Sequence, residues 1–143
     1  MSTRANIKLV DGKETLWFYR HSDGYPKVAL ELLTTFMGQV AKGEFRDNLS
    51  QAGGWLVVLG HHEYALDRCS AYDGMRWKVG SIEPTTGKHG DIEYLYRCDL
   101  AKKEIKVYSV AYKGRDKLLG TMTFCKNGWA TAKGALLKEK MKK

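Results

Sequence analysis

Two short triplets, each with a histidine two residues before an aspartate, carry the side chains best suited to chemistry. They are residues 21–23 (HSD) and residues 89–91 (HGD). Each joins an imidazole to a carboxylate, a pair that serves as acid and base in hydrolysis and also binds transition metals. If the two loops meet in space, they predict a metal-dependent phosphoester hydrolase. The alternative is turn chemistry, because aspartate near glycine accepts backbone hydrogen bonds and stabilises a loop without catalysis. In the hydrolase hypothesis, the four metal ligands would be His21, Asp23, His89 and Asp91.

Other enzyme signatures are missing from the sequence. It contains no G-x-S-x-G nucleophile segment, and Gly53 and Gly54 lack the Lys-Ser/Thr ending of a phosphate-binding loop. Its cysteines, Cys69, Cys98 and Cys125, are widely spaced and form no C-x-x-C pair. This spacing predicts reduced thiols, not a disulfide framework or a zinc site. The sequence therefore favours a protein that binds without catalysis, and it indicates no cofactor.

Aromatic residues interleaved with basic ones on predicted strands form a second candidate site. Strict alternation directs Leu16 and Phe18 toward a core. The side chains that it directs toward the opposite face of a sheet are Lys8, Trp17, Tyr19, His21, Lys106 and Tyr108. Rings that stack on bases, beside cations that neutralise phosphates, are typical of sheets that bind nucleotides or single strands. The same face also fits a homodimer interface, where aromatic residues are enriched. The predicted platform consists of Trp17, Tyr19, Arg20, Lys106 and Tyr108.

Positive charge is concentrated in the C-terminal third of the chain. Residues 1–100 contain 12 Lys and Arg against 13 Asp and Glu, whereas residues 101–143 contain 12 against 3. Clustered cations attract phosphate-bearing partners, so Lys138 and Lys140 are expected to add salt-sensitive phosphate contacts. The alternative is a solubilising tail.

The N-terminal elements that would position these residues are a hairpin and a helix. Strands are expected over residues 4–10 and 15–21, joined by an Asp-Gly turn. A helix is expected over residues 26–42, because Pro26 suits the first helical position and Gly43 suits the end.

The remaining elements are less regular in pattern. Asp47 can cap a second helix, or residues 55–59 can form a short buried strand instead. A third strand is expected over residues 77–83, followed by a loop over residues 84–90. A hairpin is then predicted from residues 92–99 and 104–110, with a final strand over residues 118–124 and a basic helix over residues 129–143.

This order of elements predicts one α+β domain over residues 1–125, with a basic C-terminal helix or tail over residues 126–143. Its sheet is expected to be mainly antiparallel, with about five strands and two helices packed on one face. No apolar run is long enough to span a membrane, and the start of the chain lacks an apolar secretory segment. We therefore expect a cytoplasmic protein without membrane contact.

Two segments resemble small uncharacterised proteins found in bacteria and their phages. These segments are residues 19–26 (YRHSDGYP) and residues 90–96 (GDIEYLY), and the likeness spans roughly residues 1–110. It implies an accessory protein of a phage or mobile element, a class in which non-enzymatic inhibitors of host machinery are common, and an inhibitor of host defence is one such possibility. The resemblance transfers no catalytic residue.

The sequence therefore predicts a non-enzymatic binding protein whose partner carries phosphate: a nucleic acid, a nucleotide or a host nucleoprotein complex. Besides the hydrolase, the other alternative is a protein-only inhibitor that docks on a host enzyme through the aromatic face.

Overall fold

The computed structural model describes residues 3–46, 48–67, 81–125, 128–129 and 134–142. Seven strands and three helices occur among these described residues. In chain order they are β1 (Ala5–Asp11), β2 (Glu14–Arg20), α1 (Pro26–Lys42), α2 (Leu49–Asp67), β3 (Ile82–Thr85), β4 (Tyr94–Asp99), β5 (Glu104–Ser109), β6 (Lys117–Cys125), β7 (Gly128–Trp129) and α3 (Ala135–Met141).

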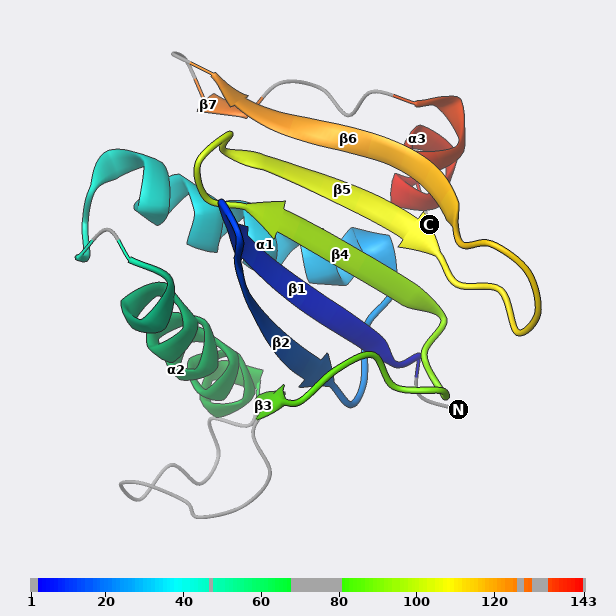
Figure 1. The fold of residues 1–143 in the computed structure, drawn as a ribbon, viewed down its shortest axis with the longest axis horizontal. Helices are drawn as coiled ribbons and strands as arrows, with labels where there is room; N and C mark the ends of the chain where they lie inside the picture. The colour runs from blue at the N-terminus through cyan, green and yellow to red at the C-terminus, as the bar shows by residue number, and fades with distance from the viewer. Residues whose placement is uncertain (1–2, 47, 68–80, 126–127, 130–133, 143) are drawn as a thin grey trace.

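The strands form a sheet in the order β3-β2-β1-β4-β5-β6-β7 (Figure 1). Every neighbouring pair is antiparallel except β1 and β4, which are parallel. The predicted α+β class and mainly antiparallel sheet are therefore confirmed. The described sheet has more strands than the expected five, and α3 lies within the segment for which a basic C-terminal helix or tail was predicted.

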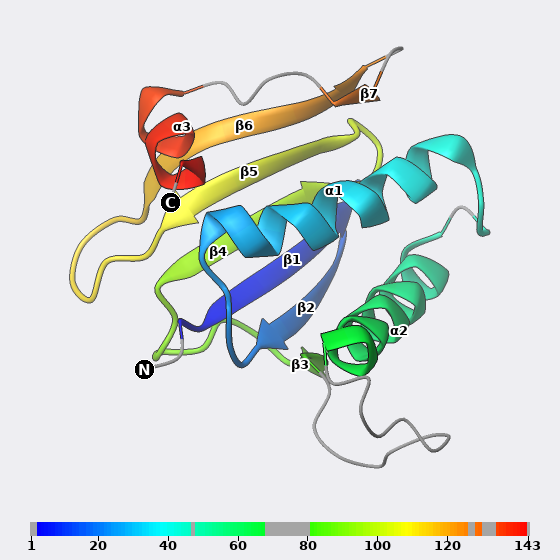
Figure 2. The same cartoon turned by 180° about the vertical axis from the view of Figure 1, so that it is seen from behind.

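The helices lie on one face of the sheet (Figure 2). We call the opposite face, which is toward the viewer in Figure 1, the open face. Helix α1 starts with Pro26 and ends at Gly43, whose left-handed φ of 71° closes the helix, as the sequence predicted. Its inward stripe is fully buried and packs with the core side chains of β1, β4 and β5. That stripe consists of Ala29, Leu30, Leu33, Phe36 and Met37.

Helix α2 covers the region for which the sequence left a strand as an alternative. The predicted cap, Asp47, lies outside the described residues; the Asn48 side chain accepts a hydrogen bond from the backbone N–H of Gln51 at 2.8 Å. A Cβ on Gly53 would lie 3.0 Å from the side chain of Phe18, and one on Gly60 would lie 2.7 Å from Ser81 Oγ. These glycines cost helix propensity but let α2 approach β2 and β3 closely.

The β2–α1 connection is held by contacts with the core. Arg20 is 1% exposed and lies on the helix side of the sheet, and its Nε donates to the carbonyl of Asp23 at 3.1 Å. Asp23 has a φ of 54°, and the carbonyl of Gly24 accepts a 2.6 Å hydrogen bond from the Tyr96 hydroxyl. A Cβ on Gly24 would lie 2.9 Å from the Cβ of Ala5. The YRHSDGYP segment therefore acts here as a packed strand-to-helix connection.

Residues 86–93, which we call the crossover, connect β3 to β4 across the open face. Both strands run in the same direction as β1, so the chain must return along the sheet before β4 begins. The helix side is occupied by α1 and α2. The crossover therefore passes over β2 and β1 on the other side, where it contacts Tyr19 and Asn6.

The C-terminal part of the chain joins the same core. Strand β6 follows the predicted 118–124 strand closely. Of the helix predicted over residues 129–143, the described residues include α3, whose Leu137 is completely buried and whose N-cap Gly134 lies beside Leu119, whereas Trp129 belongs to β7. Most of the strand expected over residues 77–83 lies outside the described residues. No described helix is long and apolar enough to cross a bilayer.

Candidate functional site

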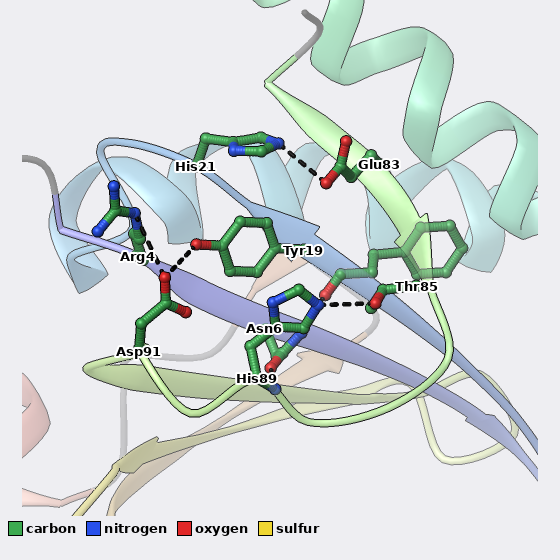
Figure 3. Close-up of polar contacts among 9 residues, drawn as sticks. Arg4, Asn6, Tyr19, His21, Glu83, Thr85, His89 and Asp91 are labelled. Atoms are coloured by element: carbon green, nitrogen blue, oxygen red, sulfur yellow. Dashed lines mark hydrogen bonds and ion pairs between the residues drawn. The ribbon is translucent and has the colours of Figure 1, made fainter.

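The two His-x-Asp triplets partly converge, and they meet on the ring of Tyr19 (Figure 3). The ring of His89 stacks on Tyr19 with centroids 4.1 Å apart, and His21 meets the same ring edge-on at 4.7 Å. The Tyr19 hydroxyl donates to Asp91 Oδ2 at 2.8 Å. We call these four residues the Tyr19 cluster.

Each polar group of the cluster has a further partner on a neighbouring element (Figure 3). Asp91 pairs with Arg4 Nε at 3.6 Å, and His21 Nε2 lies 3.1 Å from Glu83 Oε1. His89 Nε2 is 2.7 Å from Thr85 Oγ1.

The buried amide of Asn6 completes these contacts. Its Nδ2 donates to the carbonyl of Phe18 at 2.8 Å, and its Oδ1 accepts from the backbone N–H of His89 at 2.7 Å. Asn6 therefore ties the crossover to β1 and β2, and its amide groups are paired although the residue is 0% exposed.

The contacts of the Tyr19 cluster hold the crossover against β2, and we call this structural arrangement the latch. Burial, and next the hydrogen bond to Asp91, raise the pKa of Tyr19 above the 10.0 of an unperturbed tyrosine, so the hydroxyl stays protonated as a donor. Asp23 lies apart from the cluster in the β2–α1 turn. Within the described ranges, no three His, Cys, Asp or Glu side chains gather closely enough to share one metal ion.

Two members of the predicted platform are not on an accessible surface. Tyr19 points to the open face as alternation required, but the crossover covers it and leaves it 5% exposed. Arg20 has the same parity along β2 as Phe18, so it points to the helix side and is buried there. The expectation that these two residues contact a ligand from an open surface is therefore wrong.

Beyond the crossover, the open face carries three cations abreast. Register places Lys8 of β1 opposite Arg97 of β4, and Arg97 opposite Lys106 of β5. We call these three residues the cationic row. Trp17 stands opposite Lys8 at one end, with the Lys8 ammonium 5.2 Å from the centre of its ring. All four side chains are partly exposed.

The rows on either side of the cationic row differ in character. On one side, Leu95, Tyr108 and Leu118 follow in register across β4, β5 and β6, and Leu118 is 47% exposed. On the other side, Asp99 lies 3.8 Å from Arg97, and Glu104 lies 3.8 Å from Lys106. These long ion pairs only partly offset the positive charge of the row.

No family model, curated protein or solved structure matches the chain.

Like charges placed directly opposite each other on neighbouring strands destabilise a sheet. The cationic row contains two such pairs, Lys8 with Arg97 and Arg97 with Lys106. A bound anion would remove this repulsion. The row is therefore the described feature of the open face that fits a phosphate-bearing partner best.

The predicted C-terminal contacts lie apart from the cationic row. Lys138 and Lys140 are exposed on α3, which lies on the helix side of the sheet, so they do not join Lys106 and Tyr108 on one surface. Leu137 turns α3 toward the core beside β6, so any phosphate contacts of Lys138 and Lys140 would be made on a surface separate from the cationic row, and that call stays a prediction.

Sequence reasoning placed Lys8 on the open face by alternation without naming it as a site residue, and it missed Arg97. The signal for Arg97 was present in β4, where Tyr96 and Cys98 are buried and the residues between them alternate outward. What the sequence lacked was the pairing of β1 with β4, a parallel contact between strands more than 80 residues apart.

Proposed function

We propose that this protein is a non-enzymatic binding protein that engages a phosphate-bearing partner on the open face of its sheet. The observation that carries the proposal is the cationic row, which has Trp17 in register at one end. Tyr108 lies beside it in the neighbouring row, two residues along β5 from Lys106. Three inter-strand steps separate β2 from β5, so this surface is roughly 14 Å wide. Its cations would neutralise phosphates, and its rings would stack on bases.

The resemblance of residues 19–26 and 90–96 to small proteins of bacteria and their phages favours a narrower form of the proposal. In that form, the partner belongs to the host, as a nucleic acid or a nucleoprotein complex, and the protein inhibits it by occupying it. The proposal assigns no catalytic step to the Tyr19 cluster, whose histidines contact Glu83 and Thr85.

The test is the binding of a fluorescent single-stranded oligonucleotide of about 12 nucleotides, a length within the range of single-strand sites, followed by anisotropy. If the row neutralises three phosphates, a plot of the logarithm of the association constant against the logarithm of salt concentration should have a slope of about −2. Binding that ignores salt, or no binding at low salt, would contradict the proposal.

A matched pair of variants separates the row from general charge. Lys106→Gln removes a cation of the row, and Lys27→Gln removes an exposed cation of α1 on the other side of the sheet. Both lower the net charge by one. We expect Lys106→Gln to make the salt slope shallower by about 0.7, while Lys27→Gln leaves it unchanged. Equal effects would show attraction by net charge alone.

A further inference from the structure

The loop between β5 and β6, residues 110–116, presents an aromatic ring to solvent. Tyr112 at its tip is 95% exposed. Lys113 and Arg115 follow in the loop, Lys117 begins β6, and all three are exposed. At this exposure the ring adds almost no packing to its own fold, so it is available to a partner outside the chain.

The base of this loop is tied at both ends to the crossover region. The backbone N–H of Val110 donates to the carbonyl of Glu93 at 2.9 Å, and Lys88 Nζ donates to Asp116 Oδ2 at 2.6 Å. The two ties hold the loop at the margin of the open face while residues 111–115 remain exposed. They also engage Asp116, the acidic residue of the loop, so the exposed groups are cations and one ring.

The loop continues the surface that contains the cationic row. Lys106 and Tyr108 point to the open face from the same strand, and Tyr108 pairs with Leu118 immediately beyond the loop. A path of partly or fully exposed side chains thus leads from Trp17 across the row to Lys106, and then along β5 to Tyr108 and the loop that carries Tyr112. Stacking surfaces stand at both ends of this path, with cations between and beyond them.

We propose that the partner is a single strand of nucleic acid, and that Tyr112 stacks on one of its unpaired bases while Lys113, Arg115 and Lys117 contact the adjoining phosphates. This inference rests on the function proposed above and deepens it. A mononucleotide is too short to occupy both the cationic row and the loop. A duplex has no free base face for Tyr112, since its bases stack on one another.

The experiment compares oligonucleotides of about 4 and about 12 nucleotides, the lower and middle part of the range of single-strand sites, and a duplex of the longer one. Tyr112→Ala should weaken binding of the longer strand by about 5- to 150-fold, which corresponds to the loss of one stacked base. Tyr112→Trp should retain that affinity. The short strand, held on the cationic row, should bind wild type and Tyr112→Ala equally.

Trp55→Ala is the matched control, because Trp55 is 45% exposed on α2, on the other side of the sheet. It should leave the affinity for both strands unchanged. Thermal unfolding should show the fold of Tyr112→Ala intact, since the ring touches little of the protein.

The failures are distinct. If the longer strand binds Tyr112→Ala as tightly as wild type while Trp17→Ala weakens it, the loop contact is wrong and the proposed function stands. If wild type binds no strand, both fail. If the duplex binds as tightly as the single strand, or if vesicles rich in phosphatidylserine bind through Tyr112 and oligonucleotides do not, the inference is overturned.

Discussion

Tyr19 and Trp17 stand two residues apart on β2 and point to the same face of the sheet, yet they occupy opposite environments. Tyr19 is 5% exposed and lies among His21, His89 and Asp91. Trp17 remains partly exposed and contacts the ammonium of Lys8. The two residues were predicted to share one role, and the structure gives them different surroundings.

The difference arises from the path of the chain between β3 and β4. The crossover passes over one half of the open face and leaves the other half uncovered. On the covered half, polar groups with the chemistry of an active site are used to hold the crossover in place. On the uncovered half, the cations and rings do not hold the crossover and remain partly exposed. Residue type alone therefore did not show which half of the open face holds the crossover and which half is accessible to a partner.

The largest expected effect is on stability at Tyr19. Tyr19→Ala removes a buried ring together with its contacts to His89 and Asp91, and should lower the free energy of unfolding by about 3–5 kcal/mol. Trp17→Ala should lower it by about 1 kcal/mol, since a partly exposed ring over a cation contributes little. Urea denaturation measures both values. Equal losses would mean that the two halves of the open face do not differ.

The next effect is on binding at Trp17. Trp17→Ala should reduce the affinity for a single-stranded oligonucleotide by about 5- to 150-fold, the loss of one stacked base. Tyr19→Phe keeps the buried ring and should leave that affinity unchanged. Anisotropy titrations at one salt concentration decide the point. A loss of affinity in Tyr19→Phe comparable to that in Trp17→Ala would assign the covered half to the binding surface.

A smaller effect concerns the hydroxyl of Tyr19. Tyr19→Phe removes the hydrogen bond to Asp91 and should cost about 1 kcal/mol near neutral pH. Because the pKa of Tyr19 is raised in the folded protein, the unfolded chain loses this proton first, near pH 10.0. The stability linked to the hydroxyl is therefore complete below pH 10 and is lost as pH rises through the folded pKa.

Denaturation of wild type and Tyr19→Phe over a pH series tests whether the stability contributed by the hydroxyl decreases as pH rises. The difference in stability between them should narrow above pH 10. Tyr96, whose pKa is also raised by burial, is present in both proteins and cancels in the comparison. A difference that stays constant or widens with pH would contradict the latch.

The smallest expected effect is on oligonucleotide affinity at the uncovered half of the open face. Glu104→Gln removes the carboxylate 3.8 Å from Lys106 and should strengthen oligonucleotide binding by about 1.5- to 5-fold, the value of an exposed ion pair. Glu31→Gln changes the net charge equally on the exposed side of α1 and should have no such effect. Identical gains in both variants would point to net charge instead of the row.

Much of the local structure followed from the sequence. The N-terminal hairpin, α1 with its proline start and glycine end, and the β4–β5 hairpin were predicted with small errors in their bounds. Such elements depend on contacts between near neighbours in the chain, where alternation, capping and turn chemistry act directly. Helix α2 was ambiguous because its glycines weaken helix propensity, and their use in packing against β2 and β3 is a tertiary effect.

The sequence by itself determined which side chains point to which face of each strand. It placed Trp17, Tyr19, Lys106 and Tyr108 on the face opposite the helices, since alternation along a strand is a local property of the backbone. The tertiary structure alone decided which of them stay accessible. The parallel pairing of β1 with β4 set Lys8 and Arg97 side by side, and the crossover that serves this topology buried Tyr19. Both depend on contacts between residues far apart in the chain, which no local pattern encodes.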